Sequence, residues 1–306
     1  MNQFVFDSNL LNSIREQFYY LEKDYSGRER LFFENAGGSL RLKSAVEAKA
    51  RMEKIPECPE RTNDIAMWLQ QVKADGIRDF MQVMLGAHSG AVVSELTASQ
   101  VMFRIARAII ENVPGTNVVT TSIEHPSAYD SLKIYAEKTG KEFRVALANP
   151  TTGGVDTEEI LKLIDNNTCL LSVMSASNIS GYIFNLEEIA REARKIKPDL
   201  FIVTDAVQHL PHSAMDVQKL QLDGVTFAPY KAFGIRGCGF GYVSDRVAVL
   251  PHDKLIAKPS SEWELGTFPH PNYASLCAIV NYVCWIGSHF INLEDRRACF
   301  LVGMDK

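Results

Sequence analysis

The sequence predicts an α/β protein built on a mostly parallel sheet with helices on both faces. Residues 200–204 and 224–228 are short runs of β-branched and aromatic residues, which are typical of buried strands. Residues 213–220, between these runs, are polar and compatible with a helix. Apolar strands that alternate with helices indicate a parallel sheet, in which functional groups gather at the carboxyl ends of the strands.

The first two predicted strands each lead into a helix. Residues 92–96 predict a strand, which is followed by Thr97, Ser99 and an amphipathic helix. A hydroxyl cluster at a helix start accompanies free backbone N–H groups, which suit a phosphate. Alternatively, Thr97 or Ser99 only caps the helix. Residues 115–127 predict a turn, a buried strand ending near His125, and a helix opened by Pro126.

The rest of the chain continues this alternation. Further strands are expected over residues 170–175 and 238–243, helices after Asp156 and Asn185 (each with Glu three positions later), an apolar helix over 272–287, and a helical arm before residue 32.

Two charged residues mark the ends of neighbouring predicted strands. Asp205 directly follows one strand, and Lys231 lies 26 positions later, just past the end of the next. This pair suits pyridoxal 5'-phosphate (PLP), because a carboxylate keeps the pyridinium nitrogen protonated and an amine forms a Schiff base. Alternatively, both are surface residues near unrelated turns. Lys258, which precedes Pro259 in a polar stretch, is expected to be an ordinary solvated ammonium.

Taken in order, the motifs of this chain resemble those of the class V (cysteine desulfurase-like) branch of the fold-type I PLP-dependent enzymes. The matching segments are residues 33–38 (an Asn-Ala loop), 124–125 (Glu-His), 177–181 (Ser-Asn-x-x-Gly), 205–208 (Asp-x-x-Gln) and 264–267 (ending in Gly-Thr). The resemblance covers residues 33–287 and implies the fold-type I large domain, with a mostly parallel seven-stranded sheet between helices.

The resemblance also implies three catalytic residues. Lys231 would form the internal aldimine and later move the alpha proton of the substrate. Asp205 would pair with the ring nitrogen and make the ring an electron sink. His125 would stack on the ring and take part in acid–base chemistry.

Further residues are implied as cofactor ligands. Asn178 and Gln208 would hydrogen-bond the phenolic oxygen and the substrate region. Ala98, Ser99 and Tyr230 would contact the phosphate. Thr267 would reach the phosphate of the neighbouring subunit, since sites in this family lie at the interface of a homodimer.

The chain departs from the family in one motif and in length. Desulfurases commonly carry Ser-x-His-Lys where this chain has Ala-Pro-Tyr-Lys at 228–231. Tyr230 can donate one hydrogen bond, whereas Ala228 cannot, which indicates an atypical subgroup. We expect a helical arm over 1–32, a PLP-binding large domain over 33–290, and over 291–306 the start of a small domain that is largely missing. That small domain would carry the arginine that binds the substrate carboxylate and any cysteine that accepts sulfur.

Composition limits the classes of partner. The chain has 306 residues, 46% of them hydrophobic, and a net charge of −5, so it can bury a large core and has no basic stripe for nucleic acid. No apolar run reaches membrane-spanning length and the chain opens with no basic-then-apolar leader, so we expect a cytoplasmic protein without membrane contact.

The cysteines and histidines do not predict a metal site. The six cysteines lack paired spacing, and we expect core thiols, with Cys58 alone in an evident loop. His209 and His212 are separated by a proline and lack a third ligand.

Three hypotheses for function remain open. The first is desulfurase-like cleavage of a carbon–sulfur bond in an amino acid through Lys231. The second is another class V reaction, either transamination or epimerisation, that uses the same Lys231 and Asp205. The third is a truncated or catalytically impaired homologue that keeps the fold and serves as a binding or dimerisation partner.

Overall fold

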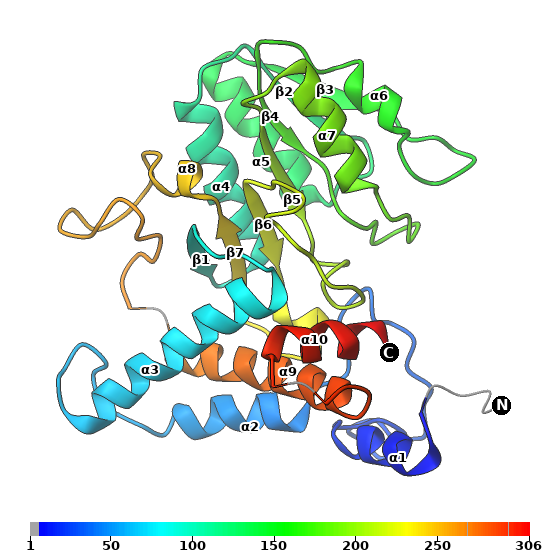
Figure 1. Cartoon of the computed structure of the whole chain (residues 1–306), viewed down its shortest axis with the longest axis vertical. Coiled ribbons are helices and arrows are strands. Elements are labelled where there is room, and N and C mark those ends of the chain that lie inside the picture. The colour runs from blue at the N-terminus through cyan, green and yellow to red at the C-terminus, as the bar shows by residue number, and fades with distance from the viewer. Residues whose placement is uncertain (1–5, 268, 293) are drawn as a thin grey trace. The chain divides into compact units, whose positions relative to one another are not determined.

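The computed structural model describes residues 6–267, 269–292 and 294–306. The chain folds into two compact units. The helical unit comprises Met1–Met84, Pro229–Arg236 and Pro269–Lys306, and the sheet unit comprises Leu85–Ala228 and Gly237–Phe268 (Figure 1). In the described part of the chain, no helix is both long enough and apolar enough to cross a membrane.

The sheet unit is organised around one sheet of seven strands. The strands are β1 (Ala91–Glu95), β2 (Asn117–Thr121), β3 (Glu142–Ala146), β4 (Thr168–Ser172), β5 (Phe201–Asp205), β6 (Gly224–Phe227) and β7 (Gly239–Val243). Their order across the sheet is β1-β7-β6-β5-β4-β2-β3. Strands β3, β2, β4, β5 and β6 pair in parallel, and β7 runs antiparallel to both of its neighbours, β6 and β1. The predicted seven-stranded, mostly parallel sheet is therefore confirmed.

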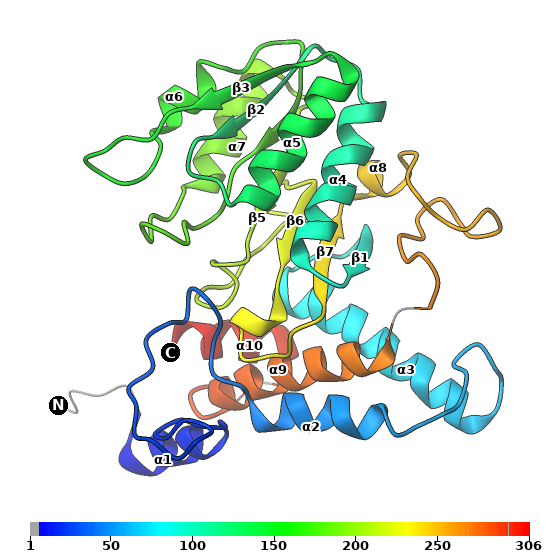
Figure 2. The same cartoon turned by 180° about the vertical axis from the view of Figure 1, so that it is seen from behind.

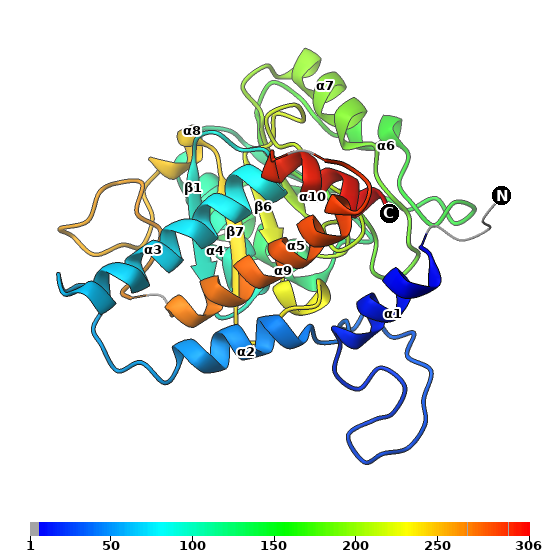
Figure 3. The same ribbon diagram turned by 60° about the horizontal axis from the view of Figure 1, so that its bottom comes forward.

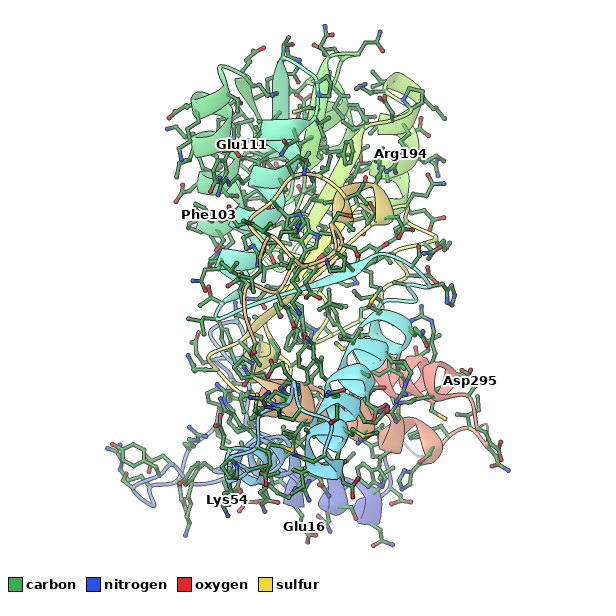
Figure 4. All side chains as sticks on the ribbon, turned by 90° about the vertical axis from the view of Figure 1, so that its left-hand side faces the viewer. Glu16, Lys54, Phe103, Glu111, Arg194 and Asp295 are labelled. Carbon is green, nitrogen blue, oxygen red and sulfur yellow. The ribbon has the colours of Figure 1, made fainter. Side chains whose placement is uncertain are left out.

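Helices cover both faces of this sheet. The helices of the unit are α4 (Ala98–Asn112), α5 (Pro126–Thr139), α6 (Thr157–Leu161), α7 (Leu186–Ile196) and α8 (Asp245–Ala248). Helices α4 and α5 lie side by side on one face (Figure 2). Figure 4 views the sheet from its edge, with Glu111 of α4 and Arg194 of α7 on opposite sides of the strands. A hydrophobic core forms where the apolar sides of α4 and α5 meet β2, β4 and β5.

Local sequence signals account for most of these helices. Asn185 caps α7 by accepting a hydrogen bond from the Glu188 N–H at 3.2 Å, as predicted. Asp156 precedes α6, but its side chain makes no capping hydrogen bond and the helix is only five residues long. The prediction of a helix over residues 213–220 is wrong, because this segment forms turns. There the Val217 N–H donates to the carbonyl of Leu85 at 2.9 Å, so it does not pair within a helix.

The helical unit is built around one long apolar helix. Its elements are α1 (Ser8–Glu16), α2 (Lys43–Met52), α3 (Asp64–Arg78), the π-helix η1 (Asp79–Met84), the 3-10 helix η2 (Pro229–Lys231), α9 (His270–Ser288) and α10 (Arg296–Asp305). Helix α9, which was predicted over 272–287, packs against α2, α3 and α10 (Figure 3). Arg296 of α10 forms a bidentate ion pair with the buried carboxylate of Asp79, at 2.9 and 2.6 Å.

The cysteines are distributed largely as expected. Cys169, Cys238 and Cys299 are buried, Cys277 and Cys284 are partly buried in α9, and Cys58 is exposed. Burial raises the pKa of the Cys169 thiol to about 11, so it remains a protonated core side chain at neutral pH.

Candidate active site

Polar side chains collect at the carboxyl edge of the parallel strands. Glu124 and His125 follow β2, Asn178 lies beyond the end of β4, and Asp205 is the last residue of β5. Strands β2, β4 and β5 are neighbours and run in the same direction, so their ends lie at one edge of the sheet. This edge is where open α/β sheets usually bind ligands.

The start of helix α4 lies directly over the sheet. Thr97 caps this helix by accepting a hydrogen bond from the Gln100 N–H at 3.2 Å. In β7, a Cβ built on Gly239 would lie 2.2 Å from the nitrogen of Ala98, so only glycine allows this close approach. The helix therefore begins at the sheet, with its first N–H groups and positive dipole end located there.

Three side chains link the starts of α4 and α5. The Ser99 and Ser127 hydroxyl oxygens are 2.5 Å apart, and the Ser127 hydroxyl is 2.8 Å from Nδ1 of His125. His125 is also the N-cap of α5, since its Nδ1 accepts the Ser127 N–H at 3.2 Å. Nδ1 is thus an acceptor, which leaves the proton of a neutral imidazole on Nε2. Thr97 fits the capping alternative, whereas Ser99 belongs to this hydroxyl–imidazole chain.

Asp205 is held rigidly at the end of β5. Its carboxylate Oδ1 accepts the N–H of Val207 at 3.0 Å. Its backbone carbonyl accepts both the N–H and the hydroxyl of Ser175, at 2.9 and 3.0 Å. The residue is 7% exposed. A carboxylate in this setting is positioned before any ligand arrives.

A tight turn holds Asn178. The Ser177 hydroxyl accepts the N–H groups of Ile179 and Ser180, each at 3.2 Å. Gly181 completes the turn with a φ of 74°, a value that favours glycine. Among the residues that the structure describes, the buried Oδ1 of Asn178 has no hydrogen-bond partner. This oxygen can therefore still accept a hydrogen bond from a ligand or a water molecule.

Glu124, next to His125, was not predicted as a site residue. Its Oε1 accepts hydrogen bonds from the Thr121 hydroxyl and the Met174 N–H, both at 2.8 Å. Burial raises the pKa of this carboxyl to about 8, and the nearby charge of Asp205 adds a smaller rise, whereas the two hydrogen bonds lower it. Glu124 is therefore largely neutral at pH 7.

In the helical unit, Lys231 ends the short helix η2. The backbone carbonyl of the preceding Tyr230 accepts the N–H and the hydroxyl of Ser39, both at 3.1 Å, and the Arg41 guanidinium at 2.7 Å. The Ser39 hydroxyl in turn accepts the Phe233 N–H at 2.7 Å. Lys231 is itself buried, with 8% of its surface exposed. These hydrogen bonds anchor the loop on both sides of the lysine, at Tyr230 and at Phe233.

Phe233 closes the Lys231 loop in an unusual backbone conformation. Its φ is 67°, which costs a non-glycine residue about 1–2 kcal/mol. Its ring packs edge-on against Phe18 and Tyr282, at centroid distances of 5.2 and 5.8 Å. This aromatic cluster within the helical unit offsets the strain and keeps the loop in place.

Cations surround the ring of Tyr230. The Arg236 guanidinium and the Lys231 ammonium lie 4.9 and 5.8 Å from the ring centroid. Burial lowers the pKa of Arg41, and repulsion by Arg236 lowers it further. Across residues 6–267, 269–292 and 294–306, neither Arg41 nor Arg236 has an acidic partner within ion-pair distance. Arg41 and Arg236 therefore contribute positive charge that suits an anionic group.

The sequence-predicted residues fall into the two units as follows. The sheet unit contains Ala98, Ser99, His125, Asn178, Asp205, Gln208 and Thr267, and the helical unit contains Tyr230 and Lys231. Ser99 and His125 are joined through Ser127, Gln208 is half-buried, and Thr267 is exposed. The sequence-based prediction did not assign roles to Ser127, Glu124, Arg41 or Arg236.

The sheet unit has the α/β architecture and the strand order described above, with its polar residues at the carboxyl edge of the sheet. The chain belongs to the class-V aminotransferase family, whose profile, described as "Aminotransferase class-V", matches residues 32–298.

Two individual proteins illustrate what this chain is similar to. The chain is 29% identical to an aminotransferase-like protein of Gibberella zeae over 73% of this chain and 55% of that relative. It is 25% identical to a probable cysteine desulfurase of Borreliella burgdorferi over 93% of this chain and 72% of that relative.

A solved structure shares the fold. The apo cysteine desulfurase of Thermococcus onnurineus NA1 superposes with a TM-score of 0.76 at 22% identity, over 90% of this chain and 71% of that one. The chain thus spans between about half and three quarters of the length of these three proteins.

Proposed function

We propose that this protein is a PLP-dependent enzyme of the cysteine desulfurase type, which cleaves a carbon–sulfur bond of an amino acid substrate. The observation that carries the proposal is the carboxyl edge of the sheet, where buried Asp205 lies on the same edge as the Ser99–Ser127–His125 chain. Desulfurase chemistry is preferred to transamination or epimerisation because relatives along most of the chain are described as cysteine desulfurases.

The residues present fit PLP. The start of α4 and the Ser99 hydroxyl offer N–H and O–H donors for a phosphate, and Asp205 offers a buried carboxylate for the pyridinium nitrogen. The orphaned amide oxygen of Asn178 indicates a ligand there, and rotation of the amide would present its NH₂ group to a phenolic oxygen. Gln208 is proposed to add a second hydrogen bond to that oxygen.

Residues of this chain would transfer the proton and stabilise the charge on the cofactor. PLP supplies an electron sink for the bonds at the substrate alpha carbon. The Lys231 amine would attach to the cofactor aldehyde and, once displaced by substrate, take the alpha proton. Asp205 would keep the ring nitrogen protonated. His125 would lie against the ring, with its tautomer fixed through Ser127.

Arg41 and Arg236 are proposed to bind the carboxylate of the substrate. A guanidinium offers paired N–H donors that match a carboxylate, and neither arginine is neutralised by a described acidic side chain. Tyr230 would fix the Arg236 group through its ring face. These residues would supply part of the substrate clamp within the present chain.

The same family membership bears on assembly and on location in the cell. We propose a homodimer in the cytoplasm, in which exposed Thr267 reaches the phosphate bound by the other subunit.

Covalent trapping tests the cofactor assignment directly. The purified protein would be incubated with PLP, reduced with borohydride and digested, and we expect the pyridoxyl adduct on Lys231. Exposed Lys258 serves as the internal control, because a solvated lysine reacts only non-specifically. An adduct on Lys258 in preference to Lys231, or none at all, would remove the basis of the proposal.

A further inference from the structure

Glu124 and Asp205 are tied to consecutive residues beyond the end of β4. The N–H of Met174 donates to the Glu124 carboxyl at 2.8 Å. The next residue, Ser175, donates its N–H and hydroxyl to the Asp205 carbonyl at 2.9 and 3.0 Å. A single stretch of backbone therefore fixes two acidic residues, one beyond the end of β2 and one at the end of β5, at the same edge of the sheet.

The surroundings of Glu124 do not suit a charge. The residue is 8% exposed, and its Oε2 is buried without a hydrogen-bond partner among the described residues. Among the described residues, the charged group that acts on the pKa of Glu124 is Asp205, which raises it. The neighbouring His125 turns its Nδ1 to Ser127. A carboxylate here would be desolvated and repelled, which favours the protonated acid.

We propose that Glu124 is a positioning residue for Asp205: it remains a neutral acid, so that Asp205 is the one charged carboxylate at this edge of the sheet. The proposal rests on the proposed function, in which Asp205 meets the ring nitrogen of PLP. Two buried carboxylates that repel one another share their titration, and one of them keeps a proton. Because Oε2 of Glu124 is buried without a hydrogen-bond partner among the described residues, Glu124 holds that proton and leaves Asp205 ionised.

The coupling can be measured on the protein without cofactor. Urea unfolding would be followed from pH 4 to pH 9.5 for four proteins. These are the wild type, Glu124→Gln, Asp205→Asn and the double variant that carries both substitutions. The folded pKa of Glu124 lies above its ordinary value of 4.5, at about 8. The wild type should therefore lose stability relative to Glu124→Gln as pH rises from about 4.5, and the loss should level off near pH 8.

The Asp205→Asn background decides the assignment. Removing the neighbouring charge should move the levelling-off point to lower pH. Glu264→Gln is the matched control, since Glu264 is also buried and accepts a hydroxyl hydrogen bond from Ser94 at 2.9 Å, but lies in a different segment. An unchanged levelling-off point in the two backgrounds would overturn the proposal. If Asp205→Asn does not fold, a carbon NMR titration of the Glu124 carboxyl, identified by its absence in Glu124→Gln, gives the same pKa.

A second measurement links the pair to catalysis. In the PLP-loaded protein, the profile of kcat/KM against pH should contain an alkaline transition near pH 8 that is absent in Glu124→Gln. Persistence of that transition in Glu124→Gln would contradict the proposed role. Failure of PLP to attach to Lys231 would instead refute the proposed function, while the unfolding experiment would still report on the coupled pair.

Discussion

The two units position their functional residues in different ways. In the sheet unit, Asp205 and His125 lie at strand ends and helix starts, so regular structure places them. In the helical unit, Lys231 lies in a loop held by Ser39 and Arg41, which are about 190 positions away in the sequence, at separations of 191 and 189. The first arrangement depends on local patterns, whereas the second depends on a few long-range hydrogen bonds. Single substitutions should therefore affect chemistry in the sheet unit and geometry in the helical unit.

The largest expected effect distinguishes the role of the Asp205 charge from the attachment of PLP to Lys231. Asp205→Ala should reduce kcat/KM by several orders of magnitude, because the carboxylate is what would keep the ring nitrogen protonated. The Lys231 loop belongs to the other unit, so borohydride trapping on Lys231 should persist in this variant. Turnover assays and peptide mapping on the same preparation test both points. Activity that survives Asp205→Ala would refute the role of this residue.

The same contrast explains what the sequence could predict. Strand β5 and Asp205 were predictable, because a short β-branched run followed by an acid is a local signal. The neutral state of Glu124 was not, because it depends on burial in the folded protein beside residues such as Met174, 50 positions away and just beyond the end of β4. The Arg41–Tyr230 contact gives no local pattern either. The segment over 213–220 was wrongly predicted as helical because its backbone pairs with Leu85.

A smaller effect is expected for substrate binding. Arg236→Gln should raise KM by about tenfold or more and change kcat less, because a charge-assisted hydrogen bond is worth about 1.5–3 kcal/mol. Arg30→Gln is a matched control, since Arg30 lies at the same 4.9 Å from an aromatic centroid, that of Phe32, but outside the Tyr230 cluster. Equal effects of the two substitutions on KM would remove the substrate role of Arg236.

The smallest expected effect compares one buried serine from each unit. Ser39 is 6% exposed and its hydroxyl both donates to the Tyr230 carbonyl and accepts the Phe233 N–H. Ser127 is 8% exposed and its hydroxyl lies between Ser99 and His125. Ser39→Ala should cost about 1–3 kcal/mol of unfolding free energy, because it leaves a backbone N–H unsatisfied at a strained residue.

Ser127→Ala should cost only about 0.5–1.5 kcal/mol, because its neighbours are half-exposed and can turn to water. The two variants should also differ in kind. Loss of Ser39 should slow borohydride trapping on Lys231, since the loop that presents the lysine loosens, whereas loss of Ser127 should leave that rate unchanged. Urea unfolding and timed trapping measure both quantities. If the two alanine variants lose equal stability and trap at equal rates, long-range hydrogen bonds do not distinguish the Lys231 loop from the sheet edge.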